Sequence, residues 1–181
     1  MHRLFVALRP PPAIRSILLA TMGGVPGARW QDDEQLHLTL RFIGEVDARV
    51  ADDIAAALGQ VHAPVATMTL AGVGRFAHRG RTDTLWAAVA PAAPLLALHC
   101  KVDAACVRAG LAPEGRAFVP HITLARLARS PSAGVEVERW VADHAALASP
   151  AFICAHLVLY ESTLGHEGAR YEAVERWPLR P

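Results

Sequence analysis

The stretch His37-Leu38-Thr39-Leu40 organises this chain, because it recurs as His121-Ile122-Thr123-Leu124. Alternating polar and apolar residues predict a half-buried strand, and in a strand residues i and i+2 point to the same face. We therefore expect the histidine and threonine of each copy to share one open face, while the two apolar residues of each copy enter a core.

An imidazole beside a hydroxyl, presented twice on rigid strands, predicts a catalytic pair. Two histidines can serve as general acid and general base on one substrate, and their unperturbed pKa of about 6.5 suits both roles near neutral pH. A four-residue pattern can recur by chance in a chain with nine histidines. Here, however, both copies lie inside a longer matching repeat.

The two motif histidines are 84 residues apart, and the elements around them repeat with about the same offset. Hydrophobic spacing predicts the order strand, helix, motif strand, helix, strand in each half. The first half has these elements at 4–8, 14–22, 36–43, 50–61 and 67–73, and the second at 84–90, 95–106, 121–127, 137–144 and 151–160. We also expect a turn at 130–134 and a last edge strand within 170–179. The pattern indicates an internal duplication.

This repeat predicts an α+β fold with mainly antiparallel sheet. We expect residues 1–181 to form a single bilobal domain built from two related units, about 1–80 and 81–181. If the units pack around a pseudo-two-fold axis, two sheets face a central cleft with helices outside. The two motif strands then meet there and bring His37 and His121 into one site.

The composition of 181 residues is 52% hydrophobic, enough for a substantial core, and the net charge is +1. The longest apolar runs are far below the roughly 18 residues of a membrane span, and the N-terminus lacks the features of a signal peptide. We therefore expect a cytoplasmic protein that binds no membrane. Lys101 stands alone against seventeen arginines, a bias that is compatible with phosphate recognition.

The sequence predicts neither a metal site nor a bound cofactor. A zinc site needs clustered ligands such as H-E-x-x-H or paired cysteines. Cys100, Cys106 and Cys154 are separated and lie in apolar surroundings, so we expect reduced, buried thiols. Nothing in the sequence implies a protein partner.

These features resemble the 2H phosphoesterase superfamily, and within it the bacterial and archaeal RNA 2′,3′-cyclic phosphodiesterases, the LigT-like "2′-5′ RNA ligases". The resemblance rests on stretches spread over nearly the whole chain: 4–8 (LFVAL), Trp30, 36–45 (LHLTLRFIGE), 118–126 (FVPHITLAR), 159–162 (LYES), Gly168, Tyr171 and 178–179 (PL). One His-x-Thr alone is a weak signal, whereas two copies with these flanks in this order are specific.

The resemblance implies a bilobal pseudo-two-fold fold and metal-independent hydrolysis of an RNA terminal 2′,3′-cyclic phosphate to a 2′-phosphate. Its substrates would be RNA ends or 2′,3′-cyclic nucleotides. By family position His37 is the proton donor and His121 the proton acceptor. Thr39 and Thr123 would bind the phosphate oxygens, and Arg126 would be a further phosphate-binding residue.

Two of these roles depend on local geometry. Strict strand alternation puts Arg126 on the core side, so it can reach the site only if the strand ends, bulges or twists near Ala125. A base-stacking platform needs an aromatic ring. Phe76, in a basic loop expected at 75–81, is our candidate, whereas alternation assigns Phe42 to the core. We expect Trp30 and Tyr160 to be structural.

Three alternatives stay open. The first is 2′-5′ RNA ligation, the reverse transfer, which would need no ATP because Lys101 lies in a helix pattern and not in a K-x-D-G-like setting. The second is an RNA-end-binding module without turnover, against which the two intact histidines argue. The third is another phosphodiester substrate, such as a cyclic ADP-ribose phosphate or a 2′-5′ oligoadenylate.

Overall fold

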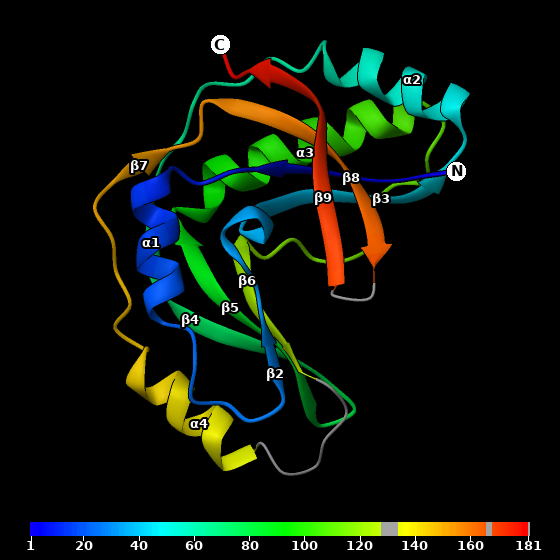
Figure 1. Cartoon of the computed structure of the whole chain (residues 1–181). Coiled ribbons are helices and arrows are strands. Elements are labelled where there is room, and N and C mark those ends of the chain that lie inside the picture. The colour runs from blue at the N-terminus through cyan, green and yellow to red at the C-terminus, as the bar shows by residue number, and fades with distance from the viewer. Residues whose placement is uncertain (128–133, 166–167, 181) are drawn as a thin grey trace.

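The computed structural model describes residues 1–127, 134–165 and 168–180. The elements follow in this order (Figure 1): β1 (His2–Leu8), α1 (Pro12–Ala20), β2 (Ala28–Trp30), the 3₁₀ helix η1 (Asp33–Gln35), β3 (Leu38–Val46), α2 (Ala48–Leu58), β4 (Thr67–His78), β5 (Arg81–Ala90), α3 (Ala92–Arg108), β6 (His121–Leu127), α4 (Gly134–Asp143), β7 (Phe152–Ile153), β8 (His156–Gly165) and β9 (Gly168–Pro178). The expected turn at 130–134 lies outside the described residues except for its last position.

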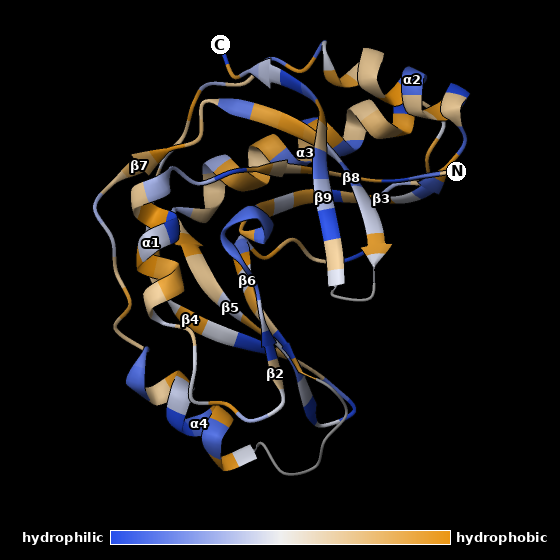
Figure 2. Ribbon diagram, viewed as in Figure 1, coloured by the Kyte–Doolittle hydropathy of each residue, from blue (hydrophilic) through white to orange (hydrophobic). Residues whose placement is uncertain are grey.

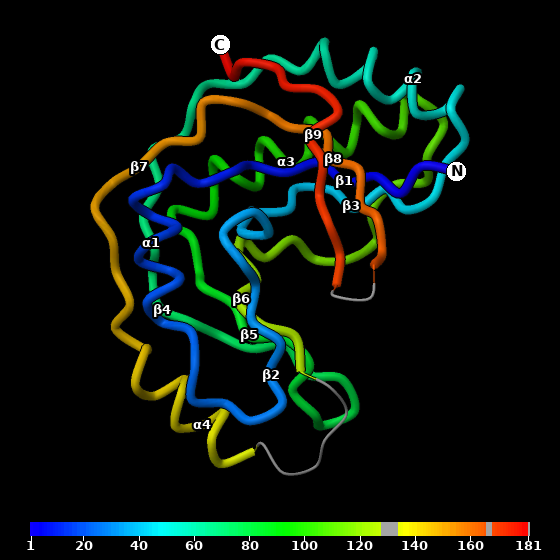
Figure 3. Tube along the Cα trace, viewed as in Figure 1, coloured from blue at the N-terminus to red at the C-terminus, as the bar shows by residue number. Residues whose placement is uncertain are grey.

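The strands form one antiparallel sheet in the order β7-β4-β5-β6-β3-β1-β8-β9, with β2 beside β6. The two motif strands, β3 and β6, lie in its middle and are joined by the pair Leu38–Ile122. We call β3, β1, β8 and β9 the first half-sheet and β6, β5, β4 and β7 the second. In Figures 1 and 3, β3, β8 and β9 lie above β4 and β5, and the short strand β7 lies at the upper left. The α+β class with antiparallel sheet is confirmed, and the two expected sheets are continuous through one strand pair.

The half-sheets mix the two sequence units. β4, the last strand of the expected unit 1–80, pairs with β5 of the second unit, and β8 of the second unit pairs with β1 of the first. The strand order is therefore symmetric about the Leu38–Ile122 pair, with β1 equivalent to β5 and β4 equivalent to β8. A pseudo-two-fold arrangement of this kind is what places both histidines at one junction.

Apolar residues of the motif strands enter the core as expected. Leu38, Leu40, Ile122 and Leu124 are all fully buried. β8 is hydrophobic where it lies beside β1, whereas the middle of the edge strand β9 is hydrophilic (Figure 2). Cys106 and Cys154 are buried as expected, but Cys100 is exposed. In the part of the chain that the structure describes, no helix has the length and apolar character to cross a membrane.

β3 carries one extra residue at the last position of its motif. Val6 of β1 pairs with Arg41 and the next residue, Ala7, pairs with Thr39, so that Leu40 has no partner in β1. This irregularity is a β-bulge, which inserts one residue and reverses the alternation of side chains beyond it.

β6 carries a bulge at the equivalent place. Leu85 of β5 pairs with Ala125, and Trp86 pairs with Thr123, so that Leu124 is skipped. Leu40 and Leu124 each follow a motif histidine by three residues. The duplication therefore extends to the irregularities of the two strands.

The two bulges decide the face on which the following residues lie. Arg126 is exposed on the face of His121, as the condition on a bulge near Ala125 required. The expectation that Phe42 lies in the core is wrong, because the bulge turns it outward, where it is 41% exposed. Arg41 is buried instead and forms ion pairs on that side of the sheet.

The basic loop expected at 75–81 is the end of a β-hairpin. β4 continues to His78 and β5 begins at Arg81. Arg79 and Gly80 form the turn with φ of 50° and 75°, and positive φ at both central residues is characteristic of a type I′ turn, which suits a two-residue hairpin. Phe76 therefore lies on a strand, which gives its ring a more fixed position than a loop would.

Candidate active site

The junction of the half-sheets gathers the polar residues of both motifs. Leu38 and Ile122 pair across it with their side chains in the core. Four half-buried polar side chains flank this pair on the opposite face: His37, Thr39, His121 and Thr123. Because neighbouring residues of a strand point to opposite faces, the side chains next to Leu38 and those next to Ile122 emerge on the same face of this junction.

Both imidazoles are held by the same contact. Nδ1 of His37 lies 2.7 Å from the carbonyl oxygen of Gln35, and Nδ1 of His121 lies 2.6 Å from that of Val119. A carbonyl oxygen only accepts hydrogen bonds, so each Nδ1 carries the proton. Each neutral imidazole therefore has its lone pair on Nε2, which can take up a proton or, once protonated, donate one.

Aromatic rings pack around the imidazole of His37. Phe5 of β1 lies 4.7 Å from it between ring centroids, and Tyr171 of β9 meets it edge-on at 5.1 Å. Tyr160 of β8 is buried and stacks on Phe5 at 5.1 Å. This packing agrees with the expected structural role of Tyr160, because its ring packs against Phe5 and Phe5 in turn packs against His37.

His121 has a similar aromatic surrounding from the second half-sheet. Phe76 of β4 meets the imidazole edge-on at 4.9 Å, and Trp86 of β5 lies 5.7 Å away. The indole of Trp86 covers Gly74, where a Cβ atom would stand 2.4 Å from the ring. A residue with a Cβ atom at this position would therefore displace the indole of Trp86.

Burial makes both imidazoles harder to protonate. The pKa of His37 is lowered from 6.5 to about 4, mainly by desolvation and in smaller part by the positive charges of His121, Arg126 and Arg9, and the hydrogen bond to Gln35 opposes this shift. Desolvation also lowers the pKa of His121, opposed by the hydrogen bond to Val119 and aided by the charge of Arg126. In the free protein both rings are therefore neutral at pH 7.

Arg126 lies on the face of His121, and its positive charge lowers the pKa of both His121 and His37. Its Nη1 donates a 3.4 Å hydrogen bond to the hydroxyl of buried Thr84 on β5. The guanidinium is otherwise exposed. An anion between the two imidazoles would find this fixed positive charge beside it.

Several residues near the histidines were not identified from the sequence. Phe42 is exposed with the Arg3 guanidinium 5.5 Å above its ring, and its position five residues after His37, as Arg126 follows His121, was the available signal. Phe5 and Trp86 come from distant strands and left no sequence signal.

Trp30 was expected to be structural, and its ring packs 5.7 Å from that of Trp140.

The profile of the 2′-5′ RNA ligase superfamily matches residues 11–166 of this chain. An RNA 2′,3′-cyclic phosphodiesterase of Aeropyrum pernix is 36% identical over 123 residues, covering 66% of this chain and 69% of the relative. The enzyme of that name from Escherichia coli is 29% identical over 186 residues, covering 98% and 97%. A third, from Geobacillus stearothermophilus, is 31% identical over 157 residues, and the chain spans about half (49%) of its length.

Solved structures of the same fold extend over the whole chain. The crystal structure of E. coli LigT in apo form superposes with a TM-score of 0.77 at 28% identity, covering 99% of this chain and 98% of that one. LigT in complex with 3′-AMP gives 0.77 at 25% identity, covering 98% of both chains. These matches confirm the fold and the family expected from the duplicated motif.

Proposed function

Because the chain belongs to the 2′-5′ RNA ligase superfamily, we propose that it hydrolyses the 2′,3′-cyclic phosphate at RNA ends. The observation that carries this proposal is the site's symmetry. Two imidazoles with Nδ1 bound to main-chain carbonyls present Nε2 on one face, beside two threonines and an arginine. Relatives that bear the name RNA 2′,3′-cyclic phosphodiesterase support the choice of substrate.

In the proposed reaction, Nε2 of His121 accepts a proton from a water molecule, and the oxygen of this water bonds to phosphorus. The bond from phosphorus to O3′ breaks, and Nε2 of His37 donates a proton to that oxygen. The product is a 2′-phosphate and a free 3′-hydroxyl. Since both rings are neutral in the free site, the anionic phosphate must raise the pKa of His37 when it binds.

The phosphate oxygens need donors while negative charge builds up in the transition state. We assign this task to the hydroxyls of Thr39 and Thr123, which flank the histidines, and to the guanidinium of Arg126. No metal ion enters this mechanism, because the arginine and the two imidazoles supply the positive charge and the protons.

The nucleoside would bind against the aromatic wall of the second half-sheet. Phe76 is half-buried beside Trp86 and His121, so a base that stacks on it lies next to the reacting phosphate. The complex of LigT with 3′-AMP supports nucleotide binding in this fold. We expect this protein to bind RNA ends and to act in the cytoplasm.

Ligation is the second candidate, favoured by the family's description. Microscopic reversibility assigns the same residues to both directions. Lys101 lies in α3, and its ammonium group donates a hydrogen bond to the main-chain carbonyl of His62. It is therefore not part of the site formed around His37 and His121. We therefore expect any ligation to join a cyclic phosphate end to a hydroxyl end without ATP.

The test is to offer the purified protein 2′,3′-cyclic AMP and an oligoribonucleotide that ends in a cyclic phosphate. We expect both to be converted to monoesters, as followed by phosphorus NMR and chromatography. Failure of the wild-type protein to open either ring would reject the proposed function, and joining of two RNA ends without hydrolysis would favour ligation.

A further inference from the structure

We propose that Gln35 is a positioning residue that makes the two histidines unequal, because it clamps the β8–β9 hairpin against the imidazole of His37. Its effect on turnover rests on the proposed function. Its effect on the environment of His37 can be measured without a substrate.

Gln35 is fixed at the end of η1 by a capping box. Its N–H donates to Oδ1 of Asp32 at 2.9 Å, and its Oε1 accepts from the N–H of Asp32 at 3.1 Å. The remaining residues of η1 are tied to the body of the protein, since Asp33 accepts from Arg15 at 2.9 Å and Glu34 accepts from Arg9 at 2.8 Å. η1 therefore provides a rigid base for the Gln35 side chain.

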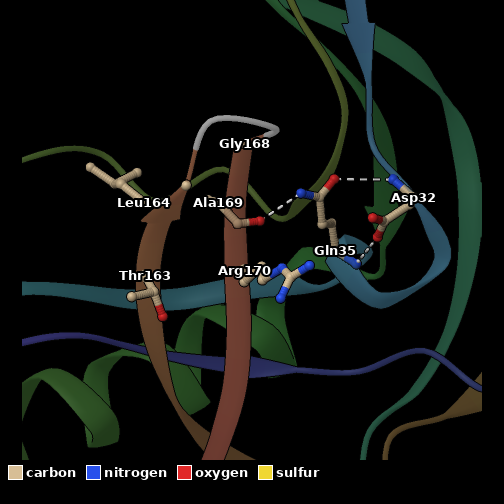
Figure 4. A pocket seen from close by; sticks show the side chains of 8 residues that line it. Asp32, Gln35, Thr163, Leu164, Gly168, Ala169 and Arg170 are labelled. Atoms are coloured by element: carbon tan, nitrogen blue, oxygen red, sulfur yellow. Dashed lines mark hydrogen bonds between the residues drawn. The ribbon is translucent and has the colours of Figure 1, made fainter.

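The two other polar groups of Gln35 point to the hairpin and to the site. Nε2 of its amide donates a 2.7 Å hydrogen bond to the carbonyl of Ala169 in β9 (Figure 4). Its main-chain carbonyl accepts the 2.7 Å hydrogen bond from Nδ1 of His37. One residue thus holds both the imidazole and the strand that lies against it.

The strand it holds delivers an aromatic ring to the imidazole. Tyr171 lies two residues after Ala169 and meets His37 edge-on at 5.1 Å, and the ring of Phe5 lies 5.0 Å from Tyr171 and 4.7 Å from His37. β9 is an edge strand, so among the described residues no further strand pairs with its outer side. The Gln35–Ala169 hydrogen bond joins this edge strand to η1.

A solvent-open groove of about 640 Å³ lies beside this clamp, with Asp32, Gln35, Thr163 and Arg170 in its wall. Figure 4 shows the amide of Gln35 spanning from η1 to β9 among these side chains. If the hydrogen bond to Ala169 is lost, the hairpin can move away and water from the groove can reach the imidazole. The desolvation that lowers the pKa of His37 then weakens.

The second motif has no such clamp. Val119 occupies the position equivalent to Gln35, and its side chain is apolar and 41% exposed. Its main-chain carbonyl still binds His121, so the two motifs share the imidazole contact and differ in the side chain. The clamp therefore acts on His37 and leaves His121 unaffected.

The direct test is to titrate both imidazoles by NMR in Gln35→Met, which keeps the length of the side chain and loses its hydrogen bonds. The ionisable groups around His37 are unchanged in this variant: Arg9, His121, Arg126, Tyr160 and Tyr171. We expect the pKa of His37 to rise by about one unit or more toward its ordinary value, while that of His121 stays in place. Val119→Ala is the matched control and should move neither.

Turnover gives a second readout. In Gln35→Met we expect kcat to fall by about 10- to 100-fold, as when a reacting group is displaced by about 1 Å, with KM nearly unchanged. Tyr171→Ala should also raise the pKa of His37, because it removes the ring that shields the imidazole from water. Tyr171→Phe keeps this ring and should leave the pKa unchanged. The Tyr171 variants test whether the ring that β9 delivers shields His37, and Gln35→Glu, which keeps the side-chain length but removes the amide donor, repeats the test of Gln35 if Gln35→Met is poorly folded.

An unchanged titration of His37 in a folded Gln35→Met variant would overturn the inference. A shift of both histidines by the same amount would also overturn it, because a general loosening of the fold has that effect. If the wild-type protein hydrolyses no cyclic phosphate, the proposed function fails while the NMR result still decides the role of Gln35.

Discussion

Phe42 and Arg126 occupy equivalent positions, each five residues after a motif histidine, and the bulges at Leu40 and Leu124 turn both of them to the face of the site. The duplicated backbone thus presents an aromatic ring in one half and a guanidinium in the other. This difference places the fixed positive charge on the side of His121, although the field of Arg126 reaches both imidazoles.

The first prediction concerns Arg126. We expect Arg126→Ala to lower kcat/KM by about 10- to 100-fold, because a charge-assisted hydrogen bond to the phosphate is lost. The pKa values of His37 and His121 should both rise, since the charge that lowers them is gone. Arg126→Lys keeps the charge and should retain the low pKa values. Wild-type kinetics in Arg126→Ala would remove this residue from the site.

The second prediction is that the two histidines act as one unit. His37→Ala and His121→Ala should each lower turnover by about 10²- to 10⁴-fold. The double variant should lose much less than the product of the single losses. Steady-state kinetics on 2′,3′-cyclic AMP measure this, and near wild-type turnover in either single variant would contradict the assignment.

The third prediction concerns pH. A bell-shaped profile of kcat/KM reports the acid and the base of the free enzyme, and burial lowers the pKa of both rings below 6.5. The optimum of kcat/KM should therefore lie below pH 6.5. The alkaline limb of the kcat profile should lie at higher pH, because the bound phosphate anion stabilises a protonated imidazole. A rate that rises steadily into the alkaline range is incompatible with a histidine acid.

The fourth prediction is that activity survives removal of metal ions. The proposed chemistry uses imidazoles, hydroxyls and a guanidinium, so dialysis against EDTA should leave turnover unchanged within about twofold. Activity that is lost on dialysis and restored by Zn²⁺ or Mn²⁺ would instead indicate a metal-dependent phosphodiesterase.

The last prediction concerns the product and Phe76. If Phe76 stacks on the base, the ribose binds in one orientation and O3′ faces His37, so 2′,3′-cyclic AMP should give 2′-AMP alone. Phosphorus NMR distinguishes the two isomers. Phe76→Ala should raise KM and loosen this selectivity, and Phe42→Ala serves as the control on the other half-sheet. A 3′-phosphate product would reverse the acid and base roles of His37 and His121.

Local alternation was enough to predict much of the fold and the centre of the site. The sequence by itself determined that His37 and His121 share an open face with their threonines while Leu38 and Ile122 enter the core, because a strand alternates with a period of two whatever its neighbours are. The order of the elements followed from the same periodicity, and the duplication predicted that the two motifs belong together.

Tertiary structure alone decided the features that depend on pairing between distant strands. A bulge is a property of register, so the exposed face of Phe42 and the position of Arg126 required β1 and β5 as partners. The same reason applies to Gln35 and Ala169, which are 134 residues apart. Their hydrogen bond exists because the chain returns its last hairpin to the first motif, and no local pattern records that return.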